Sequence, residues 1–416
     1  MRNIIVLTST IALAACGGGM GAQSAGTTSV SGTGTGSTPA ADPYTQFKTP
    51  TVAKTYNGVG ASQTLDYSTD PRGIVGDRGQ QGLQYAGNAS TVRDSKISVT
   101  YDPRDAIFTL TLQDPRSGAA TDVRFQDPGS RTDFGGVRTP QWGVQDFAAL
   151  SGIGRNTNIR YLQAGDGDPL SRYGKSGNGF VNEGDNTNAP TGTSGSAYQS
   201  TTFFYEVPGS TTQYVSFAGY VRNSLNWIDV TNGVSTFQQS HWHLERGAFA
   251  YGLTTDPNNV PKTGTGTYTG EMVGTMIYNP TLDATSTLPN YFQWLSGTSS
   301  TAVDFASDKV SLRLDAVVGA PFFDIGTTPQ AVTIAAGSTF TAAGTATINL
   351  VNTGGFTGAF QTASFNGGTA VNIAGSSIDG AFYGPAAQEV GGGFRIVGGT
   401  PDQRIDIMGA FTGKKP

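Results

Sequence analysis

The chain has 416 residues, a formal net charge of −5 and only 13% charged residues, so it lacks the concentrated basic surface that nucleic-acid binding requires. It contains 59 glycines, yet 10% of its residues are aromatic. Disordered chains have few aromatic residues and a high net charge, so this composition favours an all-β protein with many turns. Two histidines and one cysteine are too few for a His- or Cys-built metal cage, and we expect no resident cofactor.

The N-terminus has the pattern of a bacterial export signal. Arg2 precedes a short apolar run, residues 4–15, which is shorter than the roughly 20 residues that span a bilayer. The run ends in Leu13-Ala14-Ala15-Cys16, which is similar to a lipoprotein signal, where the Cys is acylated, for example with palmitate. We therefore expect a signal peptide over residues 1–15 and a lipid anchor on Cys16. The alternative is an ordinary secretory signal with a chance cysteine.

Residues 16–41 are expected to be the lipidated cysteine followed by a flexible Gly/Ser/Thr tether, because they contain almost no large apolar side chain. Residues 42–261 are expected to form a β-rich, handle-like domain with long loops. Its clearest element is a hairpin, in which residues 96–101 and 106–112 alternate between apolar and polar side chains around a Pro-containing turn.

Residues 262–416 are predicted to form a second domain of about eight short strands separated by turn residues. The expected strands are 265–278, 301–308, 310–318, 339–350, 355–365, 377–383, 390–397 and 404–411. Regular short strands of this kind are typical of a barrel or a sandwich. A barrel of eight strands can be filled by its own side chains, so it need not form a pore.

Two groups of residues are candidate ligand sites. His241 and His243 flank Trp242, and a spacing of two on a strand puts both imidazoles on one face, where they could hold a metal or haem iron. The alternative is a polar strand face with Trp242 in the core. Tyr291, Phe292 and Trp294 lie in a segment that we expect between strands, where exposed aromatic residues serve as interface anchors. The alternative is a loop folded back onto the barrel mouth.

Other motifs are weaker. The acidic turns Asp166-Gly167-Asp168 and Glu183-Gly184-Asp185 do not continue into a full calcium loop. Gly174-Lys175-Ser176 lacks the glycine that a phosphate-binding loop requires five residues before Gly174, since position 169 is Pro. No catalytic signature is present, so we expect a binding protein and not an enzyme. An integral porin is disfavoured because the Gly-rich strands carry no evident aromatic girdle.

The C-terminal segment resembles the last barrel strands of the transferrin-binding protein B family. The resemblance lies in residues 380–394 (GAFYGPAAQEVGGGF) and in Gly409-Ala410-Phe411. Residues 249–255 and 260–270 resemble the entry into the same barrel, and Val303-Asp304-Phe305-Ala306 fits its middle. The resemblance covers about residues 247–416. It implies an all-β fold in which a β-rich handle domain is followed by an eight-stranded antiparallel barrel filled with side chains.

The family resemblance also implies a function at the cell surface. Members are outer-membrane lipoproteins that capture iron-carrying proteins, haem or haem carriers and deliver the cargo to a TonB-dependent receptor. A surface-lipoprotein translocator moves many of them to the cell surface. The residue after the lipidated cysteine is Gly17. An Asp at this position would favour retention of the lipoprotein in the inner membrane, so Gly17 is consistent with the outer membrane. This chain has one barrel signature, whereas transferrin binders have two lobes, so the ligand identity stays open. The alternative function is a structural or adhesive surface lipoprotein without nutrient cargo.

Overall fold

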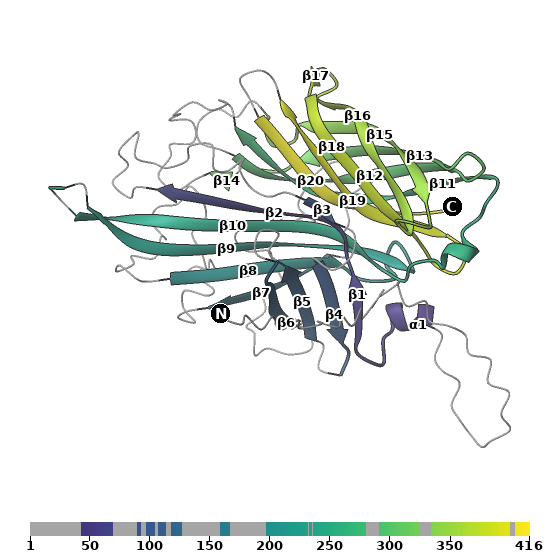
Figure 1. The fold of residues 1–416 in the computed structure, drawn as a ribbon, viewed down its shortest axis with the longest axis horizontal. Coiled ribbons are helices and arrows are strands. Elements are labelled where there is room, and N and C mark those ends of the chain that lie inside the picture. The colour runs from purple at the N-terminus through teal and green to yellow at the C-terminus, as the bar shows by residue number, and fades with distance from the viewer. Residues whose placement is uncertain are drawn as a thin grey trace, which may run out of the picture. The chain divides into compact units, whose positions relative to one another are not determined.

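The fold is all-β in a computed structural model of the chain (Figure 1), and the helical turns among the described residues are short: α1 (Pro43–Lys48) and the 3-10 turn η3 (Pro257–Asn259). The predicted signal and tether, residues 1–15 and 16–41, lie outside the residues that the structure describes. Those residues are 43–69, 90–92, 97–104, 107–113, 118–126, 159–166, 197–231, 233–234, 236–279, 291–320, 322–323, 334–399 and 404–416.

Two antiparallel sheets precede the last domain. Sheet I has four strands in the order β1-β4-β5-β6, which are β1 Lys54–Asn57, β4 Ile97–Asp102, β5 Ile107–Gln113 and β6 Ala120–Gln126. Sheet II has six strands in the order β3-β2-β10-β9-β8-β7, which are β3 Ser90–Val92, β2 Val59–Thr69, β10 Thr236–Gly252, β9 Val215–Thr231, β8 Ala197–Glu206 and β7 Ile159–Asp166.

The predicted hairpin is confirmed as β4 and β5 of sheet I, which pair antiparallel with Asp102 opposite Ile107 at the turn. Alternation places Val99 and Leu110 on the buried face, at 1% and 0% exposure. This face packs against aromatic side chains of sheet II, so the two sheets share one apolar core. That core contains Phe47, Tyr56, Ile97, Val99, Phe108, Leu110, Leu112, Phe203, Tyr205, Ala218, Tyr220, Phe249 and Tyr251.

The C-terminal strands close into a barrel, because β11 pairs with β20 on one side and with β12 on the other. The eight barrel strands are β11 Thr265–Asn279, β12 Tyr291–Asp304, β13 Lys309–Val318, β15 Thr339–Asn349, β16 Gly355–Phe365, β18 Asn372–Tyr383, β19 Glu389–Gly399 and β20 Arg404–Lys414. Two short strands lie beside them: β14 Phe322–Phe323 pairs with β12, and β17 Thr369–Ala370 pairs with β16.

The barrel interior is filled by its own side chains. Strand β15 shows the alternation clearly, since Phe340, Ala342 and Ala346 are buried while Thr345 and Thr347 are exposed. The interior positions carry one large apolar cluster, which includes Leu314, Phe356, Phe360, Phe394, Ile407 and Phe411. The predicted fold class, an all-β chain with an eight-stranded antiparallel barrel filled with side chains, is therefore confirmed.

One barrel strand differs from the sequence prediction. We expected a strand over residues 301–308 and a loop through the aromatic run before it, but β12 begins at Tyr291 and ends at Asp304. Residues 305–308 form the turn to β13, with Asp308 at a φ of 54°. The aromatic run escaped strand assignment because it lacks alternation, and alternation fails wherever both faces of a strand are buried.

One face of sheet II packs directly on the outer wall of the barrel. The backbones come into direct contact at Gly60 of β2 and Gly393 of β19, where a Cβ on Gly393 would overlap the Cα of Gly60. Three strands away on each surface, Phe204 of β8 packs edge-on against Trp294 of β12, with ring centroids 5.1 Å apart. Strand β10 ends at Gly252 and β11 begins at Thr265, and the division at 261/262 stays a prediction.

The contact predicts a cost for any side chain at Gly393. Gly393→Ala should lower the free energy of unfolding by about 1–3 kcal/mol, because the added methyl group forces two packed backbones apart. Urea unfolding followed by circular dichroism measures the loss. Gly375→Ala is the matched control, since a Cβ at this strand glycine meets no atom within 4 Å. Equal midpoints for both variants would contradict the close packing.

Candidate functional site

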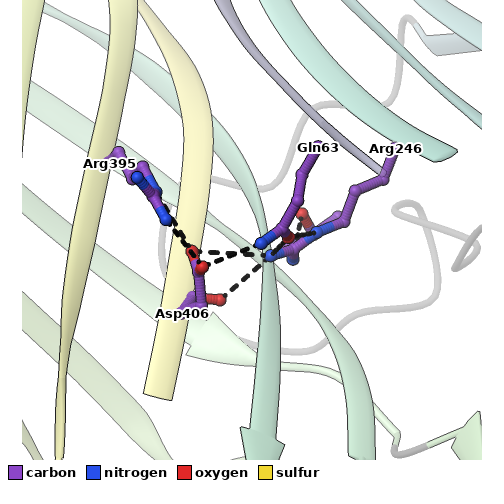
Figure 2. Close-up of polar contacts among 5 residues, drawn as sticks. Gln63, Arg246, Arg395 and Asp406 are labelled. Carbon is purple, nitrogen blue, oxygen red and sulfur yellow. Dashed lines mark hydrogen bonds and ion pairs between the residues drawn. The ribbon is translucent and has the colours of Figure 1, made fainter. Parts of the chain in front are cut away.

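Arg246 of β10 carries a fully buried guanidinium group into the interface between sheet II and the barrel (Figure 2). Its Nε donates to Oε1 of Gln63 at 2.7 Å, and Nη2 donates to the same oxygen. Nη1 donates to Oγ1 of Thr275 in β11 at 2.8 Å, and Nη2 also donates to the carbonyl oxygen of Asp406 at 3.2 Å. Arg246 therefore connects two strands of the barrel to sheet II.

The carboxylate of Asp406, in β20, is the centre of the same cluster. It accepts a hydrogen bond from Nε2 of Gln63 at 2.8 Å and one from Nη2 of Arg395 at 3.0 Å. Nη2 of Arg246 lies 3.6 Å from its other oxygen. Arg395 is 26% exposed while Asp406 and Arg246 are buried, so water still reaches only one of the two guanidinium groups. We refer to sheet II and the barrel as the two modules. A buried carboxylate that accepts hydrogen bonds from both modules resists their separation, because separation would leave a buried charge without partners.

A second barrel carboxylate reaches sheet II elsewhere along the interface. Glu389, at the start of β19, accepts hydrogen bonds from three consecutive backbone N–H groups, those of Gln213, Tyr214 and Val215, at 2.6, 2.7 and 3.1 Å. These groups immediately precede or begin β9. Burial raises the pKa of Glu389, and the three N–H donors together with Lys414 offset part of that rise. The arrangement is a backbone anion site occupied by the protein's own side chain.

Two of the three predicted aromatic site residues, Phe292 and Trp294, lie at this same interface. Trp294 is fully buried between Phe204 of sheet II and Phe292, whose ring centroid is 5.8 Å away. Phe292 is 6% exposed, and for Tyr291 the structure describes the strand position only. Phe292 and Trp294 thus anchor an interface within the chain. Their predicted role in binding a ligand or partner, like that of Tyr291, stays a prediction.

His241 and His243 both lie in β10, where His241 pairs with Asn226 and His243 with Ser224 of β9. The structure describes their backbone only, so their role towards haem or a metal stays a prediction. Cys16 lies outside the described residues, and its lipidation is likewise untested. Within the described ranges, no group of three or more His, Cys, Asp and Glu side chains is placed to hold a metal ion.

The sequence did not lead us to predict the charged residues of the interface, although the sequence contains an indication of them. Asp406 and Arg395 each interrupt an apolar or Gly-rich strand of a chain with only 13% charged residues. A charge in such a strand needs a partner if it is buried. Sequence alone does not show which of the few charges are buried or which strands lie opposite.

The two ends of the barrel differ in their connections. At one end, residues 305–308, 350–354 and 384–388 join the strands. At the other end β11 ends at Asn279 and β12 begins at Tyr291, while β13 ends at Val318 and β15 begins at Thr339, so more residues separate these strands in the sequence. Long connections carried by a rigid scaffold are where binding residues concentrate. Among the described helices, none has the length and apolarity to cross a membrane.

Comparison with known proteins identifies the barrel. Residues 260–415 match a family described as the C-lobe and N-lobe beta barrels of Tf-binding protein B. No curated protein sequence matches the chain at a significant level.

Among solved structures, the chain is similar to a mutant of the vaccine antigen transferrin-binding protein B from Haemophilus parasuis Hp5. The identity is 16%, over 87% of this chain and 76% of that chain, with a TM-score of 0.27. It is also similar to the intact N and C lobes of Ap-TbpB, at 13% identity over 88% and 78% of the two chains and a TM-score of 0.24. Scores this low carry no argument, so the assignment depends on the match over residues 260–415. Residues 260–415 are therefore a barrel of the transferrin-binding protein B type.

Proposed function

We propose that this chain is a surface-exposed binding protein that captures a protein carrier of iron or haem, or haem itself. The observation that carries the proposal is the match of residues 260–415 to the barrels of transferrin-binding protein B, a family named for binding transferrin. A family of binding proteins also accounts for a chain whose sequence contains no catalytic signature.

The packed barrel supports a ligand held on the outside of the protein. Phe356, Phe394 and Phe411 fill the interior at 0% exposure, so this barrel is of the kind that is packed with its own side chains and not of the kind that encloses a small ligand. A ligand must therefore bind to the outer surface or to the connections, and an extended outer surface suits a protein better than a small molecule. A haem carrier or iron carrier meets this requirement more readily than free haem.

The remaining parts of the proposal concern location and partners. A lipid on Cys16 would hold the protein at the outer membrane, and two or three acyl chains give a stable anchor where one chain does not. A surface-lipoprotein translocator would expose it to the medium. The captured cargo would then pass to a TonB-dependent receptor in the same membrane. The longer barrel connections mark the end at which we expect the carrier to bind.

The lipid anchor predicts a change in fractionation. Cys16→Ser should move the protein from the membrane fraction to the soluble fraction once the signal is removed, because no acyl chain is attached. Metabolic labelling with palmitate and immunoblotting of the two fractions measure the effect. Ser24→Ala, in the predicted tether, is the control and should leave labelling and location unchanged. A processed Cys16→Ser protein that stays in the membrane fraction would contradict the anchor.

The binding proposal predicts retention of a carrier. Soluble protein carrying Cys16→Ser and lacking residues 1–15 is immobilised and exposed to iron-loaded transferrin, haemoglobin, haem-albumin and free haemin. We expect one of them to bind with a dissociation constant in the micromolar range or tighter, about 8 kcal/mol of binding free energy. The iron-free or haem-free form of each carrier is the matched control.

Binding of no probe, together with expression that does not respond to iron, would contradict the proposal and favour a structural or adhesive protein. Attachment assays on a deletion strain, run separately from iron-limited growth, distinguish that alternative. If haemin alone binds, loss of its Soret shift in His241→Ala and His243→Ala would assign the histidines as ligands. An unchanged shift would exclude them.

A further inference from the structure

The interface between sheet II and the barrel wall is held at two separate points by buried carboxylates of the barrel. At the first point Glu389 accepts three backbone N–H groups, from Gln213 to Val215. At the second point Asp406 contacts Gln63 and Arg246 of sheet II. Each carboxylate is 3% exposed, so neither can exchange its protein partners for water without opening the interface.

The two points lie far apart along the same face of the barrel. Asp406 pairs with Val397 of β19, and Glu389 is 397 − 389 = 8 residues away on that strand. At roughly 3.3 Å per residue, this separation is about 26 Å. A single point of attachment leaves two bodies free to rotate about it. Two points at this distance exclude both rotation and sliding of sheet II over the barrel wall.

Between the two points, sheet II and the barrel wall are too close for a further layer of side chains or water to lie between them. Gly60 and Gly393 bring the backbones into direct contact, and Gly391 packs against Val215 and Ala250. Glycine contacts fix the spacing of the two surfaces but have no directional preference, because they contain no hydrogen-bonding side chain. The orientation of sheet II on the barrel therefore depends on directional contacts, which are those of Glu389 and Asp406 together with the Arg246–Thr275 hydrogen bond beside Asp406.

We propose that Glu389 and Asp406 form a two-point lock that holds sheet II and the barrel as one rigid body, and that this rigidity positions both modules for the carrier. The positioning of both modules for a carrier rests on the proposed function, whereas the lock itself does not. Rigid presentation raises affinity because less freedom is lost when the partner binds. Glu389 and Asp406 are thus positioning residues, with no direct contact to the ligand.

The lock is tested with Glu389→Gln, Asp406→Asn and the double variant, all carrying Cys16→Ser. Asp315→Asn is the matched control, since Asp315 pairs with Arg313 on the exposed side of the barrel at 2.6 Å. Cys16 is the only cysteine of the chain, so introduced cysteines can be labelled specifically.

Spin labels at Arg160→Cys of sheet II and Thr347→Cys of the barrel report the distance between the modules by pulsed electron resonance, in the absence of any ligand. Both positions are exposed. We expect a narrow distribution for the wild type and the control, an intermediate width for each single variant, and at least a doubling of the width for the double variant. A distribution as narrow in the double variant as in the wild type overturns the lock.

A disulfide cross-link between the two modules tests whether an effect of the double variant comes from lost rigidity or from local damage. It also keeps the proposal testable if the double variant unfolds without the cross-link. A Cβ built on Gly391 lies 3.1 Å from Cβ of Ala250, slightly less than the separation of about 3.5–4.5 Å in disulfides, so a small shift of the strands allows the bond. Ala250→Cys with Gly391→Cys is combined with Val215→Ala, because Cγ2 of Val215 would otherwise lie 2.7 Å from the new Cβ.

In the double variant, the oxidised pair should restore hydrogen-exchange protection at residues 59–63, and reduction should remove it. Unchanged exchange upon oxidation overturns the proposal. The positioning for a carrier is tested with the carrier that binds in the panel: the double variant should bind it about tenfold more weakly, and oxidation should restore the affinity. If no carrier binds, the proposed function is contradicted. The distance and hydrogen-exchange measurements, which need no ligand, still show whether the two-point lock exists.

Discussion

Backbone contact between sheet II and the barrel is the constraint on which the arrangement of the two modules depends. At Gly60 and Gly393 neither strand has room for a side chain, so the interface gains stability from close packing and from the hydrogen bonds of a few buried polar groups. This accounts for the glycine-rich strand β19, whose outward positions include Gly391 and Gly393. Glycine in a strand normally weakens it, and here the close approach of a second backbone offsets that cost.

The same constraint explains where the few buried charges lie. Arg246 and Asp406 are 160 residues apart in sequence and meet because β10 and β20 belong to the two surfaces that glycine brings together. Once water is excluded, each charge must have its donors or acceptors supplied by the opposite surface. Arg395, which is still partly exposed, lets the cluster hold two guanidinium groups against one carboxylate without burying the full excess charge.

The barrel and the β4–β5 hairpin were predictable from sequence because one face of each strand is apolar and the other polar, as at Val99 and Leu110. The prediction failed in β12, where Trp294 packs on sheet II while neighbouring positions point into the barrel core. A strand buried on both faces has no period to detect. The polar cluster around Asp406 was beyond prediction for another reason: its partners depend on which strands face each other across the interface, and strand alternation carries no information on that.

These findings change what the composition of the chain implies about function. A Gly-rich, charge-poor surface protein could serve simply as an adhesive, with repeated flat strands and no specific geometry. Here Gly393, Arg246 and Asp406 lie inside the molecule, where they fix sheet II on the barrel. An adhesive surface gains little from such fixed geometry, whereas a surface that must match a folded carrier gains affinity from it. The interior of the barrel is filled by residues such as Phe394, so a partner would have to contact the outer surface or the connections between strands.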